Sequence, residues 1–406
     1  MLPAKVLSVR LSGWSGLPSG ESASAGRRSQ HGMSAHPYRF GIEEEYFLAD
    51  AETRGTPRRS VKPFHQAAGE RLPEIGRELL QCQVEVCTPP STAFPAAYAA
   101  LREQRQALAE LGREHGLLVF AAGTHPIADW ARQLPTKGDR YRGILRDVGL
   151  AGRRSLICGM HVHVEVADPD RRVALMDRLL PFQPLLFALS VSSPFWQGKP
   201  TGLAAYRLSA FGELPRTGLP DLMGNAAAYE RYVRIMTNAG SIQDASFLWW
   251  SLRPSIKFPT LELRIADSCT RLADAIVVAA LFRCLVRLIE RRPDINAGLT
   301  GVSRAIAAEN LWRAQRSGIE AELIDEASEQ AFPFDAALDT LLSLIAEDAE
   351  ALGCTEEVAD ARRILREGTS ADRQIAAFEG TRGGDTSNRQ ALDAVVDWLA
   401  ETTRDG

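Results

Sequence analysis

The stretch FGIEEEYFLAD at residues 40–50 places three consecutive glutamates inside an otherwise apolar segment. Successive side chains of a β-strand point to opposite faces, so Glu43 and Glu45 share one face. Glu44 then lies on the apolar face or at a local bulge. Carboxylates gathered on a partly buried surface repel one another and lose hydration, so they either hold protons or bind cations. Metal binding is the simpler solution.

Three more segments show the same alternation of apolar and polar residues. The polar positions are His161 and His163 in CGMHVHVEV, Glu85 in LLQCQVEVCT, and Glu262 and Arg264 in TLELRIAD. For any one strand, the alternative is an antiparallel sheet whose polar face is only solvated. Four such strands together favour one shared polar face that collects acids, imidazoles and an arginine.

The residue types on this face indicate which ion would bind. Oxygen-rich ligands with a single imidazole suit Mg²⁺ or Mn²⁺ better than zinc, which prefers Cys and His in a closed four-coordinate shell. Mg²⁺ in such sites generally holds substrate phosphates. Arg264, beside Glu262, would complement a phosphate oxygen by a forked, charge-assisted contact. The pattern therefore predicts a metal-nucleotide site.

Hydrophobic periodicity predicts the elements that position these residues. Strands are expected at 39–49, 80–88, 117–124, 156–167 and 260–267. Helices are expected at 92–115, 170–191, 226–237, 272–291, 301–315, 334–352, 356–366, 370–379 and 387–402. The order predicts an α+β fold, a sheet covered by helices and followed by a helical C-terminal part. Residues 1–36, rich in Ser, Gly and Arg, are expected to be a disordered N-terminal extension.

Composition excludes some classes of partner. The formal net charge is -4, and Lys and Arg are scattered along the chain, which disfavours a nucleic acid or a membrane surface as partner. No segment reaches the roughly 18 uninterrupted apolar residues of a membrane helix. The six cysteines form no CxxC pair, so we expect them to be reduced, buried, cytosolic and without a catalytic role.

Seven motifs, taken in order, resemble the glutamate-cysteine ligase type 2 family, the ATP-dependent carboxylate-amine ligase branch of the glutamate-cysteine ligase superfamily. They are FGIEEEYFLAD, ELLQCQVEVCTP, GTHPIADW, DRYRGIL, CGMHVHVEV, YRLSAFGELPRTGLP and FLWWSLRPSIKFPTLELRIADS. The resemblance runs from about residue 38 to the C-terminus, so residues 37–406 are expected to form the catalytic domain. It implies a glutamine synthetase-like fold, a curved, mainly antiparallel sheet whose concave face holds metals and ATP.

The resemblance also implies roles for individual residues. The implied metal ligands are Glu43, Glu45, Glu78, Glu85, His161 and Glu262. Arg264 is implied to contact phosphate, and we place Arg142 beside it as a second catalytic residue. Glu78 lies seven positions before Glu85 and cannot share a face of one straight strand with it, so Glu78 is expected in the preceding turn.

Three further residues are expected to bind substrate. Arg207 and Arg253, like Arg142, are flanked by aromatic residues and are candidates for holding substrate carboxylates. For each of them, an exposed structural arginine is the alternative. His163 is a candidate for substrate binding, or for orienting His161.

The implied reaction is ATP-driven formation of a carbon–nitrogen bond. The γ-carboxylate of an amino acid such as glutamate attacks the terminal phosphoryl group, and an amine such as cysteine displaces the acyl phosphate, releasing ADP and phosphate. This is the chemistry of glutathione biosynthesis in the cytoplasm, although members that resemble this sequence are inefficient with cysteine. A homo-oligomer is left open.

Three other functions are alternatives to a ligase for a chain with this sheet. A zinc hydrolase with an HxH strand would need more histidines, and none follows His163 in the chain. A guanidino-type phosphotransferase could share the sheet and an arginine-rich nucleotide site. A non-catalytic protein that binds metal and nucleotide could keep the same sheet without turnover.

Overall fold

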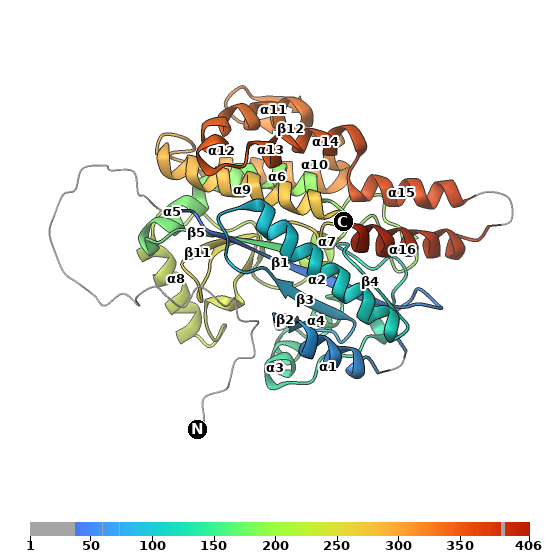
Figure 1. Cartoon of the computed structure of the whole chain (residues 1–406). Helices are drawn as coiled ribbons and strands as arrows, with labels where there is room; N and C mark the ends of the chain where they lie inside the picture. The colour runs from blue at the N-terminus through green and yellow to red at the C-terminus, as the bar shows by residue number, and fades with distance from the viewer. Residues whose placement is uncertain (1–36, 59, 73, 383–385) are drawn as a thin grey trace.

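The computed structural model describes residues 37–406 except for 59, 73 and 383–385. The predicted disordered extension at 1–36 lies outside the described residues. Within them, the predicted α+β class is confirmed: a mainly antiparallel sheet is covered by helices and followed by a helical C-terminal part (Figure 1).

A seven-stranded antiparallel sheet forms the centre of the molecule. Its strands are β1 (Phe40–Asp50), β2 (Ile75–Arg77), β3 (Gln83–Cys87), β4 (Leu117–Phe120), β5 (Met160–Glu165), β10 (Leu252–Pro254) and β11 (Thr260–Leu263). The order is β10-β11-β5-β1-β3-β2, and β4 pairs with the second half of β1. All five predicted strands are present. The three-residue strands β2 and β10 were not predicted, because so short a segment shows no clear alternation.

Helices α2 (Phe94–Glu114), α5 (Pro169–Leu179), α6 (Gln183–Ser190) and α9 (Leu272–Arg291) cover the apolar face of the sheet. Strand residues such as Ile42, Val162 and Leu263 are fully buried in one cluster with α9. α9 is buried along nearly all of its length, as expected for a helix apolar on most sides. Figure 1 shows α9 and α2 side by side over the sheet.

The C-terminal part contains the predicted helices and one unpredicted hairpin. Its helices are α10 (Gly301–Ser317), α11 (Phe334–Leu344), α12 (Ala346–Leu352), α13 (Thr355–Ala359), α14 (Ala361–Glu367), α15 (Ser370–Thr381) and α16 (Asn388–Asp405). The hairpin is β12 (Glu322–Asp325) with β13 (Gln330–Pro333). The predicted helix at 334–352 is divided at Ile345, which has non-helical backbone angles. The predicted helix at 356–366 is likewise divided, at Asp360, into α13 and α14.

Smaller elements connect these layers. The helices are α1 (Lys62–Arg71), α3 (Asp139–Val148), α4 (Leu150–Arg153), α7 (Arg207–Phe211) and α8 (Ala226–Asn238). The 3-10 turns are η1 (Trp130–Arg132), η2 (Leu180–Phe182), η3 (Ala245–Phe247) and η4 (Gly318–Glu320). Two-residue strands pair as β6 (Phe195–Trp196) with β7 (Lys199–Pro200) and β8 (Thr217–Gly218) with β9 (Trp249–Trp250).

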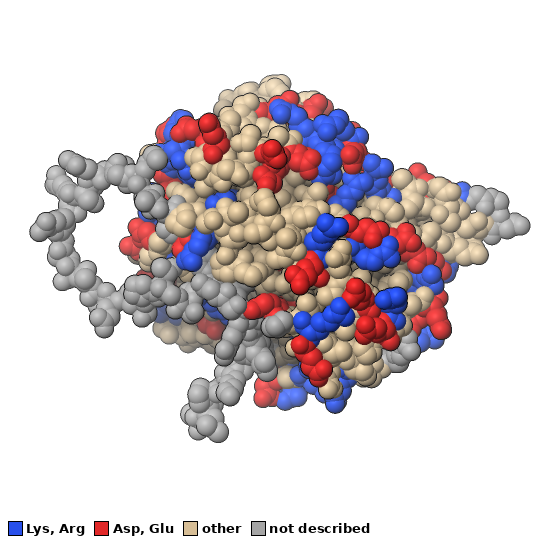
Figure 2. All heavy atoms as spheres, viewed as in Figure 1, with Lys and Arg blue, Asp and Glu red and all other residues tan. Residues whose placement is uncertain are grey.

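One helical stretch among the described residues, Pro169–Ser190, has the length and hydropathy of a membrane span. It comprises α5, η2 and α6, and 78% of its most apolar window is buried inside the protein. Packing within the core therefore accounts for its apolar character. On the face seen in Figure 2, acidic and basic side chains are interspersed over the described surface.

Candidate active site

The register of the sheet brings the predicted acids and imidazoles onto one face. Glu43 on β1 lies opposite His161 on β5 and, on its other side, opposite Cys87 on β3. Glu45 lies opposite Glu85. Glu43 Oε2 is 3.3 Å from Nδ1 of His161, and Glu45 Oε1 is 3.7 Å from Nε2 of the same ring. Period-two alternation therefore placed these side chains on the correct face.

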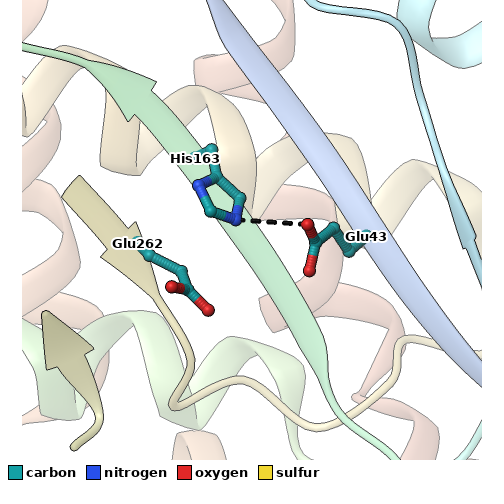
Figure 3. Close-up of side chains that lie close together, drawn as sticks. All are labelled: Glu43, His163 and Glu262. Carbon is teal, nitrogen blue, oxygen red and sulfur yellow. Dashed lines mark ion pairs between the residues drawn. The ribbon is translucent and has the colours of Figure 1, made fainter. Parts of the chain in front are cut away.

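The same face continues from β5 onto the neighbouring strand β11. Glu262 lies opposite His163, and both side chains point toward Glu43 from their own strands (Figure 3). His163 Nε2 is 3.3 Å from Glu43 Oε1, and its Nδ1 shares a 2.8 Å hydrogen bond with Oγ1 of Thr260. Thr260 therefore fixes the orientation of the His163 ring.

Glu78 completes the acidic group. It follows the last residue of β2 and precedes β3, so it comes from the connecting segment, as the spacing required. The ligand atoms of Glu45, Glu78 and Glu85 all lie within 4.8 Å of one another. Two further groups meet the same limit. They are Glu43 with His163 and Glu262, and Glu43 with Glu85 and Cys87.

The electrostatics of the three clustered acids favour the binding of a cation. Burial, and then the negative charges of Glu43 and Glu78, raise the pKa of Glu85 well above its ordinary value. Burial and the charge of Glu45 raise the pKa of Glu78. Burial also raises the pKa of Glu45, against the opposing effect of Arg207. A divalent cation would relieve all three effects at once.

The pKa values of the two histidines shift in opposite directions. Burial, and then the neighbouring guanidinium of Arg264, lower the pKa of His161 to about 4, so its ring is neutral and able to ligate a metal. Burial works against a charged ring at His163 too, but the charge of Glu43 outweighs it and raises the pKa of His163. In turn, His163 and His161 overcome the effect of burial and lower the pKa of Glu43.

These donors fit Mg²⁺ or Mn²⁺. The face presents carboxylate oxygens in majority with one neutral imidazole, a donor set that hard divalent cations accept. The Cys87 thiol beside it is a soft donor that these cations do not favour. The side chains of Glu43 and Glu45 keep 15% and 14% of their surface exposed, so a ligand can reach them. Metal binding by the six predicted ligands stays a prediction.

Glu262 is held by two arginines. Arg253 donates to both of its carboxylate oxygens, at 2.9 and 3.1 Å, and also to the carbonyls of Ser246 and Leu248. Arg264 Nη1 pairs with the same carboxylate, while its buried Nε has no hydrogen-bond partner among the described residues. Burial opposes ionisation of Glu262, but Arg253 and Arg264 lower its pKa well below the ordinary value. The side chain of Arg264 as a whole keeps 15% of its surface exposed.

The remaining two predicted arginines do not pair with Glu262, although the charge of Arg207 acts on Glu45. Arg207 is only 3% exposed and donates to the carbonyls of Ile265 and Arg264, so it supports the chain at the end of β11. Arg142 lies on α3, exposed and paired with Asp139. The phenol of Tyr141, next to it, donates to the carbonyl of Arg77 beside Glu78. Their predicted substrate and catalytic roles stay predictions.

Glu44, the third acid of the opening stretch, points to the opposite face. The β1–β3 pairing is continuous through Glu44, so the alternative of a bulge is not needed. Arg105 on α2 donates to its two carboxylate oxygens, at 3.0 and 2.6 Å, and Tyr46 also donates to it. The guanidinium of Arg105 also donates hydrogen bonds to the backbone carbonyls of Cys269 and Thr270. Glu44 is therefore a satisfied, fully buried structural acid.

Sequence reasoning missed three residues that the structure places around the two faces. Cys87 was interpreted as a small buried hydrophobe, yet the alternation of QVEVC continues to Cys87 and would have put it beside the acids. Thr260, opposite Glu165, gives no signal of its contact with His163. Arg105 stands in line with Leu101 and Leu108 on the apolar stripe of α2, a spacing that predicts a buried charge needing a partner.

Two cavities of the described structure lie away from the clustered acids and histidines. One cavity of about 370 Å³ lies against residues 60–64 and 114–117. Another, of about 420 Å³, lies against residues 53–58 and 127–134. Neither of these two cavities is lined by the clustered acids or histidines.

Comparisons with known proteins agree with the fold and with the motifs. The family model described as "Glutamate-cysteine ligase family 2" matches residues 39–395. A protein of Rhodospirillum rubrum named "Putative glutamate--cysteine ligase 2" is 44% identical over 376 residues, which are 91% of this chain and 97% of that one. A protein of the same name from Ectopseudomonas mendocina is 42% identical over 365 residues, 90% and 96% of the two chains.

Two solved structures share the fold at low identity. Glutamate–cysteine ligase of Francisella tularensis, in complex with AMP, gives a TM-score of 0.67 at 14% identity, covering 91% of this chain and 89% of that one. A bifunctional glutathione synthetase of Pasteurella multocida gives 0.64 at 15% identity. The match covers 90% of this chain and 52% of that longer protein.

Proposed function

This chain belongs to the glutamate-cysteine ligase family 2, and from that premise we propose that it is an ATP-dependent carboxylate-amine ligase. The proposed carboxylate substrate is an amino acid such as glutamate. The proposed acceptor is an amine, with cysteine as one candidate and not a favoured one. The proposed setting is the cytoplasm.

One observation carries the proposal: acids from three separate stretches of chain, with two histidines, converge on a single buried sheet face. A purely structural sheet would have no reason to bury mutually repelling carboxylates. The proposed metal ligands are Glu43, Glu45, Glu78, Glu85, His161 and Glu262. Bound Mg²⁺ or Mn²⁺ would neutralise the triphosphate and the charge that develops at the transferring phosphoryl group.

The protein's own residues supply positioning and charge. Arg264, anchored through Glu262 and with a partly exposed side chain, is suited to bind a phosphoryl oxygen. Arg253 keeps Glu262 ionised and oriented. No nucleophilic side chain is required, because the substrate's own carboxylate attacks the phosphoryl group and the amine then displaces phosphate.

The test is a screen of amine acceptors with purified protein, ATP, Mg²⁺ and glutamate, read by mass spectrometry of the coupled product. We expect one acceptor to give an amide together with stoichiometric ADP and phosphate. A product that retains the phosphoryl group would favour a guanidino-type phosphotransferase instead. Metal-dependent ATP binding with no phosphate release for any acceptor would favour a non-catalytic binding protein.

A further inference from the structure

Cys284 and Cys354 bring two buried thiols into contact in the C-terminal half of the molecule. Their Sγ atoms lie 3.5 Å apart, although the residues are 70 positions apart in the chain. Cys284 lies within α9, and Cys354 immediately precedes α13. Neither side chain has any exposed surface. The contact therefore depends on how α9 packs against the segment that joins α12 to α13.

Charged contacts hold these elements in register. Asp348 on α12, fully buried, pairs with Arg287 and, at 2.9 Å, with Arg291 of α9. Arg283 of α9 reaches the carbonyl of Leu352 at 3.5 Å. These arginines are spaced four residues apart on α9, so they form one ladder facing α12. The two sulfurs therefore lie in contact without a covalent bond between them.

The two thiols are chemically unequal. Their mutual hydrogen bond, and then the guanidinium of Arg283, lower the pKa of Cys354 against the effect of burial. The same hydrogen bond raises the pKa of Cys284. One thiol thus stabilises the thiolate of the other, which is the arrangement of an attacking and a resolving cysteine.

We propose that Cys284 and Cys354 are a modification site at which a small peroxide forms an intramolecular disulfide. The sulfurs need to approach by about 1.5 Å to reach the bonded distance of about 2 Å. Hydrogen peroxide is the oxidant: Cys354 sulfur attacks it, water leaves, and a sulfenic acid forms. Cys284 sulfur then displaces a second water, so two thiols and one peroxide give one disulfide and two waters.

The bond would tie α9 to the C-terminal helical layer. A cross-link that closes a loop of 70 residues restricts the unfolded chain. We therefore expect the oxidised protein to have a thermal midpoint higher by about 5 °C than the reduced protein. This inference does not depend on the proposed ligase activity.

The experiment treats the full folded chain with hydrogen peroxide, blocks the remaining thiols during denaturation, and maps peptides by mass spectrometry without reduction. We expect one cross-linked peptide pair containing Cys284 and Cys354, two hydrogens lighter than the separate peptides, which dithiothreitol reverses. Cys284→Ser and Cys354→Ser should each lose the cross-link and the gain in thermal midpoint. Cys82→Ser, a buried cysteine outside the pair, is the matched control and should keep both.

Several results would overturn the proposal. One is sulfinic or sulfonic acid at these positions without a cross-link. Another is a set of cross-links that also includes Cys82, Cys87, Cys158 or Cys269, which would mean that the bond forms only in unfolded chains. An unchanged or lower thermal midpoint of the cross-linked protein would contradict the stabilising effect. The peptide map uses the unmodified sequence, so it decides the question even where a serine variant fails to fold.

Discussion

The two faces of the central sheet differ in what surrounds their buried glutamates, and the consecutive residues Glu44 and Glu45 of β1 show both situations. On the helix-covered face, Glu44 has a complete set of partners in Arg105 and Tyr46. On the other face, Glu45 lies among Glu78 and Glu85 and keeps partial exposure. A buried acid whose partners are all within the protein is structural, whereas buried acids that need an external cation indicate a site.

Each of the following experiments separates the two faces, because loss of a structural acid should lower stability and loss of a site acid should lower activity. Their expected effects decrease from the first to the last.

The largest effect is expected from Glu43→Ala or Glu262→Ala, which remove an acid from the site face. Each should reduce ATP-dependent turnover by about 1000-fold, because the metal ligands and the anchor of Arg264 are lost. Steady-state assays with the best acceptor measure the loss, and circular dichroism checks that the fold is kept. Glu103→Ala, at an exposed position of α2, is the matched control. Turnover at the wild-type rate in either site variant would rule out the proposed placement.

The next effect is expected from Glu44→Ala on the helix-covered face. It should lower the free energy of unfolding by about 3–5 kcal/mol, because Arg105 is left buried without its counter-charge. Denaturant unfolding followed by circular dichroism measures the change. The double variant Glu44→Leu with Arg105→Met should lose much less, since no unpaired charge remains. A stable Glu44→Ala protein that has lost turnover would show that Glu44 belongs to the site instead.

A smaller effect is expected from Thr260→Val, which removes a contact to the site but no charge. The change deletes the hydroxyl that orients His163 and keeps the shape of the side chain. Metal affinity or turnover should fall by about 10-fold, because His163 lies against Glu43, a proposed metal ligand, and would no longer hold it in place. Titration with Mn²⁺ measures the affinity. An unchanged affinity and rate would mean that His163 is positioned without Thr260.

The smallest effect concerns pH and the metal-free protein. The pKa of Glu85 is raised in the folded state. At pH values above the ordinary pKa of a glutamate, the folded chain therefore still holds a proton that the unfolded chain has released. Stability should therefore fall as pH rises above about 4.5, by at most about 1.4 kcal/mol per pH unit for one proton. Urea unfolding in a chelating buffer at several pH values measures the slope, and Glu85→Gln should flatten it. A wild-type slope retained in Glu85→Gln would assign the proton to another group.

Much of the site could be predicted because strands carry a strict period of two. FGIEEEYFLAD and CGMHVHVEV each assign residues to faces without reference to any other part of the chain. Glu43, Glu45, His161 and Glu262 were therefore placed on one polar face before any pairing was known. Long periodic helices such as α9 and α10 were predicted for the same reason, whereas the short strand β2 and the β12–β13 hairpin were not.

The roles of the arginines could not be predicted in this way. Arg207, Arg253 and Arg264 look alike in sequence, but Arg253 and Arg264 clamp Glu262 and Arg207 supports backbone carbonyls. The difference depends on which carboxylate or carbonyl lies within about 3 Å of each guanidinium. Arg142, predicted to be catalytic, is exposed on α3 beside Asp139.

The sequence by itself determined which side chains share a face, which of the longer segments are strands or helices, and which family the motifs resemble. Only the tertiary structure decided that β5, β1, β3 and β11 lie adjacent, that Arg105 neutralises Glu44, and that Cys284 meets Cys354. The physical reason is that periodicity is a local property of the backbone. Charge pairing and sulfur contact depend on distances between residues far apart in the chain, and those are set by packing.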